Sequence, residues 1–270
     1  MGKLDGKVAF ITGGARGQGR SHALALAREG ADIVVVDIGG QSLGHPNYPV
    51  ASASDLEETV RLVEDLDRRC VAVTADVRSD EQVKSAVERA VSEFGHIDIV
   101  VANAGIADKT TPFWEITRED WDGLLAVNLT GVWQTCKYTA QQLIRQGTGG
   151  SMILISSVAG IKGLAGLAHY NAAKFGVRGL AKTFANELGE FGIRVNSIHP
   201  GTVDTPMIDA IASMSGATKE QLMPGFLQLQ IFQQPLEPRD TSAGVVWLAS
   251  DDSRYVTGLE LVIDGGWITK

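Results

Sequence analysis

The sequence predicts a single α/β domain, with a doubly wound parallel sheet of seven strands and helices on both faces. Three observations lead to this fold class. Seven short apolar segments alternate with helical segments along the 270 residues, a glycine-rich turn follows the first apolar segment, and no internal repeat or linker divides the chain. Strands that alternate with helices form parallel sheets, because each return to the sheet needs a crossover connection that is usually a helix.

The predicted strands are continuously apolar, which is typical of strands buried on both faces. They are expected at Val8–Ile11, Ile33–Val36, Val71–Thr74, Ile97–Val101, Met152–Ile155, Ile193–Ile198 and Glu260–Ile263. The first helix follows the glycine-rich turn and runs to Ala27. Further helices are expected at Asp55–Arg69, Asp80–Phe94, Arg118–Arg145, the segment that carries Tyr170 and Lys174, and Thr241–Ala249.

Composition excludes several classes of protein. The formal net charge is -8 and no basic stripe is present, so a nucleic-acid partner is not expected. No apolar run approaches the roughly 20 residues that span a bilayer, and the first residues lack the apolar core of a signal peptide. Cys70 and Cys136 have neither a metal-binding spacing nor the pattern of a disulfide framework. We therefore expect a reduced, cytoplasmic protein with no metal site and no membrane contact.

The first strand leads into the sequence TGGARGQG at residues 12–19, and the second strand ends at Asp37. Glycines in such a turn allow main-chain N–H groups to approach a pyrophosphate, whose charge the helix N-terminus stabilises. The spacing Gly13, Gly17, Gly19 differs from the usual Gly-x-Gly-x-x-Gly pattern. Asp37 stands where an acid binds the ribose hydroxyls of NAD and repels the extra phosphate of NADP. Arg16 could instead favour that phosphate, but the more direct Asp37 contact favours NAD.

Two segments have no clear period. Residues 38–54 are rich in Gly, Pro and Ser, and they form a long insertion beside the expected adenosine site. Residues 206–235 read as irregular and contain several Met, Phe and Leu residues. Such a mixture suits an adaptable apolar lid over a substrate. A surface excursion that packs on another subunit is the alternative for this second segment.

The candidate chemistry lies after the fifth strand. Tyr170 and Lys174 are four residues apart on a predicted helix, so their side chains lie on one face. An ammonium group beside a phenol favours the phenolate, and a pKa nearer neutrality would suit Tyr170 to general acid–base exchange. Ser157 could hold the same substrate oxygen from the other side. His199, at the end of the sixth strand, is expected to be structural because no nucleophile is paired with it.

With these motifs in place, the chain resembles the short-chain dehydrogenase/reductase family along nearly its whole length. The ordered set is TGGARGQG, Asp37, Asp76-Val77, Asn103-Ala104-Gly105, Asn128, Ser157, Tyr170-x-x-x-Lys174, Pro200-Gly201 and Asp264-Gly265-Gly266. The resemblance implies an enzyme in which Tyr170 exchanges a proton with the substrate. Lys174 would lower the pKa of Tyr170 and bind the nicotinamide ribose, Ser157 would orient the substrate, and Asn128 would hold a water that links Lys174 to solvent.

The resemblance also implies an NAD site. Asp76 and Val77 would meet the adenine, residues 103–105 would line the adenosine ribose, and Val203 and Thr205 would hold the carboxamide and pyrophosphate. The full set of implied cofactor contacts is Gly13, Ala15, Arg16, Gly17, Gln18, Gly19, Asp37, Ile38, Asp76, Val77, Asn103, Ala104, Gly105, Tyr170, Lys174, Pro200, Gly201, Val203 and Thr205.

A narrower similarity covers residues 13–38 and the insertion that follows, which resemble the carveol-dehydrogenase-like branch of actinobacteria. This branch is associated with mycofactocin as an external electron acceptor, and its insertion is thought to cover a tightly held NAD. The resemblance therefore implies a homotetramer that oxidises an alicyclic or terpenoid secondary alcohol, with an external redox acceptor. The residues Gly201-Thr202 depart from the branch near the nicotinamide.

Three other functions remain open from the sequence. An NADPH-dependent ketoreductase of the same fold would work in the reductive direction, and Asp37 disfavours it. A catalytically idle regulator that senses nucleotides would not need Tyr170 and Lys174. An epimerase or dehydratase is disfavoured because the chain is short and has no separate substrate domain.

Overall fold

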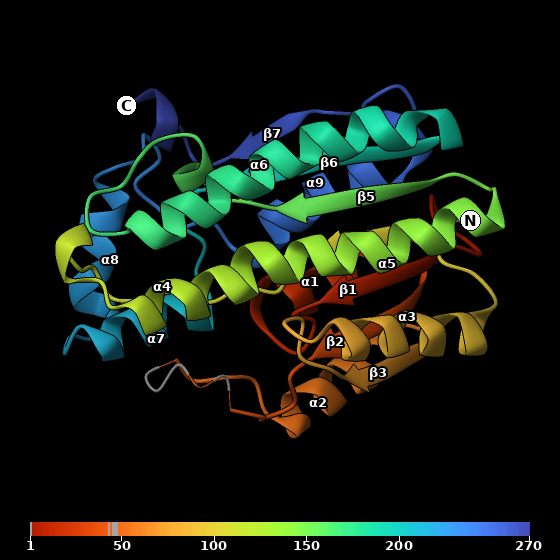
Figure 1. Cartoon of the computed structure of the whole chain (residues 1–270), viewed down its shortest axis with the longest axis horizontal. Coiled ribbons are helices and arrows are strands. Elements are labelled where there is room, and N and C mark those ends of the chain that lie inside the picture. The colour runs from red at the N-terminus through yellow and green to blue at the C-terminus, as the bar shows by residue number, and fades with distance from the viewer. Residues whose placement is uncertain (1, 43, 45–47) are drawn as a thin grey trace.

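The computed structural model of the protein describes residues 2–42, 44 and 48–270. Its centre is one seven-stranded parallel sheet with the order β3-β2-β1-β4-β5-β6-β7, which confirms the predicted fold class (Figure 1). The strands are β1 (Val8–Thr12), β2 (Asp32–Asp37), β3 (Cys70–Thr74), β4 (Ile99–Ala102), β5 (Gly150–Ile155), β6 (Ile193–Pro200) and β7 (Glu260–Ile263). The chain reverses direction of winding between β1 and β4, so a crevice opens at the carboxyl ends of these two neighbours.

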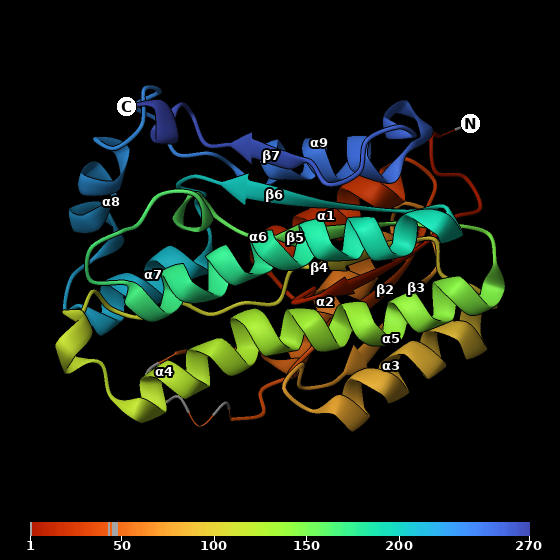
Figure 2. The same cartoon turned by 45° about the horizontal axis from the view of Figure 1, so that its top comes forward.

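Helices cover both faces of the sheet. They are α1 (Gly17–Arg28), α2 (Ala53–Glu64), α3 (Asp80–Phe94), α4 (Arg118–Leu125), α5 (Gly131–Gln146), α6 (Ala168–Leu188), α7 (Pro206–Met214), α8 (Lys219–Leu227) and α9 (Pro238–Ala249). Buried residues of α3, α5 and α6 share one core layer, and those of α1, α2 and α9 share the other. Figure 2 shows α5 and α6 side by side along the length of the sheet.

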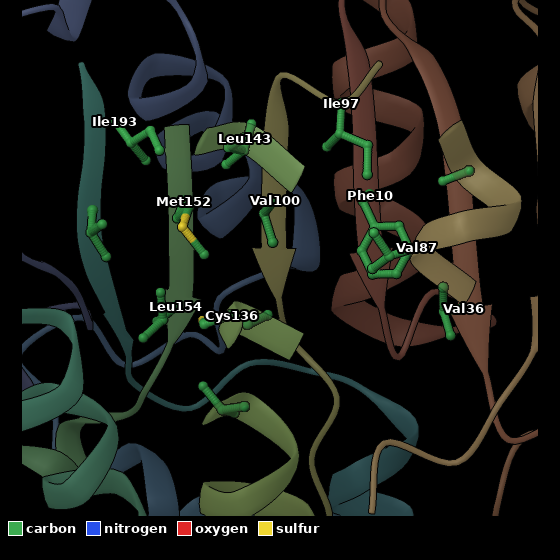
Figure 3. Packing of buried hydrophobic residues seen from close by; sticks show 14 of the residues in the cluster. Phe10, Val36, Val87, Ile97, Val100, Cys136, Leu143, Met152, Leu154 and Ile193 are labelled. Atoms are coloured by element: carbon green, nitrogen blue, oxygen red, sulfur yellow. The ribbon is translucent and has the colours of Figure 1, made fainter. Parts of the chain in front are cut away.

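The strand pleat sends alternate residues of each strand into the two layers. On β1, Val8 and Phe10 belong to the α3–α5–α6 layer, whereas Ala9 and Ile11 belong to the opposite layer. Figure 3 shows Phe10, Val100 and Met152 on three adjacent strands of the first layer. All three side chains are fully buried. This arrangement explains why the strands read as continuous apolar runs rather than as alternating ones.

Several predicted boundaries were wrong. Helix α2 ends at Glu64 rather than near 69, because the chain turns through Asp67 with a positive φ of 56° before β3. The continuous helix expected over 118–145 is interrupted by a π-helical turn, Ala126–Thr130, between α4 and α5. Strand β4 begins at Ile99 rather than Ile97, and α9 begins at Pro238, where Glu237 and Asp240 form a capping box.

The segment 206–235 is also more regular than the sequence predicts. It contains α7 and α8, and Pro224 lies inside α8. None of the residues of α8 is buried, and the proline inside it is a residue that normally indicates the end of a helix. Within the described part of the chain, no helix is both long and apolar enough to span a membrane.

Candidate cofactor and active site

A single cleft gathers residues from the carboxyl ends of β1, β2, β3, β4 and β5, together with α6 and the start of α7. Its lining contains most of the predicted cofactor residues: Gly13, Arg16, Gly17, Gln18, Gly19, Asp37, Ile38, Asp76, Val77, Asn103, Ala104, Gly105, Tyr170, Lys174 and Thr205. The other predicted cofactor residues, Ala15, Pro200, Gly201 and Val203, do not line it. The Ala15 side chain is fully buried behind the turn, and the main chain of Gly201 packs on β7.

The glycine turn brings main chain close to the cleft. Gly13 has a φ of 67°, and a Cβ atom there would lie 2.8 Å from the Ala104 Cα. A Cβ atom at Gly19 would lie 2.0 Å from the Gly13 carbonyl oxygen. Both positions therefore exclude any side chain, because helix α1 begins directly against the turn that precedes it. This packing leaves the N-terminus of α1 open towards the cleft, which is the arrangement that receives an anionic group.

Asn103 holds the glycine turn to the neighbouring strand. Its Nδ2 donates to the carbonyl oxygens of Thr12 and Gly13, at 3.0 and 3.2 Å. The Thr12 hydroxyl accepts hydrogen bonds from the main-chain N–H groups of Asn103 and Ala104, at 3.1 and 3.2 Å. These contacts fix the width of the crevice between β1 and β4. Asn103 thus lines the cleft, and its side chain stabilises the glycine turn.

Asp37 ends β2 at the rim of the cleft. Its Oδ2 accepts from the Ala15 N–H at 3.0 Å, and its Oδ1 accepts from the Ile38 N–H at 2.8 Å. Burial raises the pKa of this carboxyl group, while the two main-chain donors and the Arg16 guanidinium act in the opposite direction. The carboxylate is therefore held in one orientation beside the glycine turn. Asp76 lines the same end of the cleft, where Arg78 pairs with it at 2.6 Å.

The catalytic candidates lie at the opposite end of the cleft. The hydroxyl groups of Tyr170 and Ser157 share a hydrogen bond. Lys174, 4% exposed, places its Nζ 5.6 Å from the centre of the Tyr170 ring and donates to the Ile155 carbonyl oxygen at 3.0 Å. The structure thus brings Ser157, Tyr170 and Lys174 together at the end of β5. Ser157 itself is not part of the cleft lining, although its neighbour Ser156 is.

The expected effect of Lys174 on Tyr170 is not what the protein shows. Burial raises the pKa of Tyr170 to about 12, and only the hydrogen bond from Ser157 opposes this rise. Burial lowers the pKa of Lys174 to about 8. The prediction of a lowered phenol pKa was therefore wrong for the protein alone, because burial of the phenol outweighs the hydrogen bond from Ser157, which is the one effect that lowers this pKa.

The side chain of Asn128 bonds the main chain of a neighbouring loop. It is fully buried in the π-helical turn, its Oδ1 accepts from the Ile106 N–H at 2.8 Å, and its Nδ2 donates to the Ile106 carbonyl oxygen at 2.8 Å. The carboxamide is therefore engaged with the main chain that follows β4, and the expected water between Lys174 and solvent stays a prediction. This pairing satisfies a buried polar group and fixes the loop beside Lys174.

Sequence analysis missed other residues at this site. Tyr48 and Val50 of the insertion line the cleft, and Arg16 donates a hydrogen bond to the Pro49 carbonyl oxygen. Residues 43 and 45–47 of the predicted insertion lie outside the described residues. Met207 of α7 lines the cleft as well. No spacing in the sequence identifies these residues, because they reach the site from segments without a period.

A buried histidine–aspartate contact lies directly beside Tyr170. The Nε2 atom of His169 lies 3.2 Å from Oδ2 of Asp108, and both side chains are almost fully buried. His169 begins the helix that carries Tyr170, and Asp108 lies in the loop that follows β4. The pair therefore ties that loop to the start of α6. The contact could not be predicted from the sequence, because His169 and Asp108 are far apart along the chain.

A family model described as Enoyl-(Acyl carrier protein) reductase matches residues 13–268. The chain is 41% identical to (-)-trans-carveol dehydrogenase of Rhodococcus erythropolis, with 100% of both chains covered. It is 46% identical to an uncharacterized NAD-dependent oxidoreductase of Mycobacterium tuberculosis, covering 98% of this chain and 97% of that one. A crystal structure of carveol dehydrogenase from Mycobacterium avium in complex with NAD superimposes with a TM-score of 0.94 at 43% identity, and each chain is covered completely.

Proposed function

The chain belongs to the short-chain dehydrogenase/reductase family, and we propose that it is an NAD-dependent dehydrogenase that oxidises a hydrophobic secondary alcohol to a ketone. The observation that carries the proposal is the placement of Tyr170, Lys174 and Ser157 at one end of a cleft whose other end holds Asp37 and the glycine turn. The relatives named as carveol dehydrogenases support an alicyclic or terpenoid substrate.

The cleft residues fit NAD. A side chain at Gly13 or Gly19 would collide with main chain, so the turn is shaped for close approach of a phosphate group. The Oε1 atom of Gln18 is buried and has no hydrogen-bond partner among the described residues, although Gln18 lines the cleft. Asp37 would bind the adenosine ribose, and Tyr170 and Lys174 would bind the nicotinamide ribose. When bound, NAD supplies the hydride acceptor and a positively charged ring.

In this mechanism Tyr170, as the tyrosinate, would accept the hydroxyl proton of the alcohol while the C=O bond forms, and bound NAD would supply the hydride acceptor for the C–H bond that breaks. The Ser157 hydroxyl orients the substrate oxygen through the same hydrogen-bonding position that it shares with Tyr170. Lys174, with its pKa lowered to about 8, carries a titratable proton near neutral pH. It can therefore hold or release positive charge as Tyr170 gains its proton, which favours proton exchange in both directions.

The insertion 38–54 is proposed to cover the cofactor and to slow its exchange. The hydrogen bond between Arg16 and the Pro49 carbonyl oxygen joins the insertion to the glycine turn, and Tyr48 contributes to the cleft wall. A cofactor held in this way needs an external redox acceptor to turn over, and mycofactocin is the acceptor that the branch resemblance suggests. The segment 206–235 is proposed as the substrate lid, since Met207 lines the cleft.

Substitution of Tyr170 tests the catalytic assignment. A Tyr170→Phe variant keeps the ring but loses the proton acceptor, so we expect kcat to fall by about 10²-fold or more. The assay measures oxidation of cyclohexanol, menthol and carveol with an artificial electron acceptor. Tyr138→Phe, which removes a hydroxyl that binds Asp80 on α3, is the matched control. Undiminished turnover by Tyr170→Phe would remove the basis of the proposed function.

Cofactor identity has its own test. Because Asp37 is fixed beside the ribose position, the protein should bind NADH at least tenfold more tightly than NADPH. Equilibrium fluorescence titration with the two nucleotides measures this ratio. Preferential binding of NADPH would instead support the ketoreductase that the sequence left open.

A further inference from the structure

His199 connects β6 to the main chain of Ser157. The imidazole is fully buried near the carboxyl end of β6. Its Nδ1 atom lies 3.0 Å from the Ser157 carbonyl oxygen, and its Nε2 atom lies 2.9 Å from the Ser197 hydroxyl oxygen. Sequence analysis assigned this histidine no role at the site. The geometry places it one hydrogen bond away from a residue of the proposed catalytic group.

The two contacts determine which nitrogen carries the proton. A carbonyl oxygen can only accept, so Nδ1 must be the donor to Ser157. In the neutral ring Nε2 is then an acceptor, and the Ser197 hydroxyl donates to it. The other contact of that hydroxyl, with the Leu259 carbonyl oxygen, is longer at 3.4 Å. Burial lowers the pKa of His199, which keeps the ring neutral and the direction of both hydrogen bonds fixed.

The Ser157 carbonyl oxygen is held by two donors. Besides His199 Nδ1, the Gly160 N–H donates to it at 2.9 Å. Gly160 is itself fixed, since a Cβ atom there would lie 2.5 Å from the Ser156 hydroxyl oxygen and 2.7 Å from the Lys174 carbonyl oxygen. The Ser157 hydroxyl accepts from the Ala159 N–H at 3.1 Å. The orientation of the peptide after Ser157 therefore determines where its hydroxyl group lies relative to Tyr170.

We propose that His199 is a positioning residue for Ser157, which it serves by donating from Nδ1 to the Ser157 carbonyl oxygen and so fixing the direction of the Ser157 hydroxyl. This inference rests on the proposed function, in which that hydroxyl orients the substrate oxygen. Ser197 has a supporting part, because its hydroxyl fixes the tautomer of His199. A misplacement of about 1 Å in such a group can cost about 10²-fold in rate.

The test compares two substitutions at the same position. His199→Leu removes the donor, and we expect kcat with the best alcohol of the panel to fall about 10- to 100-fold. His199→Asn retains an N–H donor near the position of Nδ1, so it should recover most of that loss. His22→Leu is the matched control: His22 is equally buried and its Nδ1 lies 2.8 Å from the Ser242 hydroxyl oxygen, away from the catalytic end of the cleft. It should lower thermal stability without the loss in kcat.

A double-mutant cycle with Ser157→Ala separates positioning from general damage. If His199 acts through Ser157, His199→Leu should have little further effect on kcat once the Ser157 hydroxyl is absent. Equal losses in both backgrounds, or a His199→Asn variant as impaired as His199→Leu, would overturn the inference. If His199→Leu does not fold, Ser197→Ala provides the measurement, because it leaves the ring in place and should lower kcat only when Ser157 is present. Full activity of Ser157→Ala alone would refute the proposed role of Ser157 and leave the rest of the mechanism to the Tyr170 test.

Discussion

At the scale of single residues, desolvation dominates the titration of the proposed catalytic pair. Burial raises the pKa of Tyr170 to about 12 and lowers that of Lys174 to about 8. Each shift favours the neutral form of its group, because removal from water disfavours the charged form of acids and bases alike. In the protein alone, burial therefore opposes the tyrosinate that the proposed mechanism requires.

The lowered pKa of Lys174 has a consequence for stability. A lysine whose folded pKa lies below its unfolded value of about 10.5 destabilises the fold while it is charged, and the cost is complete below about pH 8. We therefore expect Lys174→Met to be more stable than the wild type at pH 7, by up to about 3 kcal/mol. This advantage should shrink as pH rises from 8 to 10.5, because the wild type then loses the buried charge.

Urea unfolding of both proteins between pH 7 and pH 10 measures the difference in free energy of unfolding. Lys84→Met, which replaces an exposed lysine on α3, provides the control for loss of a lysine without burial. An advantage of Lys174→Met that stayed constant over this range would show that the ammonium group carries no burial cost.

At the scale of elements, the site depends on how strand ends and helix starts are joined. The π-helical turn Ala126–Thr130 directs Asn128 inwards to the main chain of Ile106. The hydrogen bonds of the Asn103 side chain and of the Thr12 hydroxyl hold the glycine turn against β4. Each of these hydrogen bonds joins two different elements. Together they hold the elements at a fixed distance across the cleft. The insertion adds a further connection through Arg16 and Pro49.

We expect the hydrogen bond between Arg16 and the Pro49 carbonyl oxygen to slow the release of the cofactor. An Arg16→Ala variant loses the hydrogen bond to the Pro49 carbonyl oxygen, so the insertion should open more often. A lost hydrogen bond to a charged group is worth about 1.5–3 kcal/mol, which corresponds to a rise of about 10- to 100-fold in the dissociation rate of NADH. Stopped-flow displacement of bound NADH measures this rate, and Gln41→Ala in the exposed part of the insertion is the control.

Heat denaturation of the purified, gel-filtered protein measures how much cofactor stays bound to each chain. The supernatant of heat-denatured wild type should contain nicotinamide cofactor close to one per chain, and that of Arg16→Ala should contain less. A supernatant without nucleotide, combined with rapid turnover on free NAD, would contradict the proposed covering role of the insertion.

At the scale of the whole molecule, several large apolar side chains are exposed to solvent. Trp133 and Ile144 on α5 are 42% and 36% exposed, and Phe175 on α6 is 40% exposed. The two helices lie side by side in both views (Figures 1 and 2). Exposed large apolar groups on neighbouring helices favour association with a second copy. We propose the homotetramer that the family resemblance implies, with these helices in one of its interfaces.

Light scattering after gel filtration tests this assembly. The wild type should have four times the chain mass of 28.7 kDa, and a Trp133→Glu, Phe175→Glu variant should dissociate to smaller species because a charge is costly in an apolar interface. Tyr255→Glu, at a side chain that is 91% exposed in a different part of the surface, should keep the wild-type mass. A wild-type mass of a single chain would contradict the proposal.

The sequence by itself determined the fold class and most of the cofactor site. Apolar runs on seven strands identify a parallel sheet, and residues that directly follow those strands must meet at its carboxyl edge. For this reason Asp37, the glycine turn, Ser157 and the Tyr170–Lys174 helix could be predicted as site residues from their order and from the family resemblance that this order carries. Local spacing contains that information, and the described structure agrees with it.

Only the tertiary structure decided the contacts that adjust this site. Four such contacts join residues that are distant in the sequence: His199 with the Ser157 carbonyl oxygen, Asn128 with Ile106, His169 with Asp108, and Tyr48 with the cleft. The pKa directions of Tyr170 and Lys174 were decided in the same way. Burial and long-range pairing depend on how the layers pack in three dimensions. The periodicity of residues along the chain does not show which distant residues come into contact.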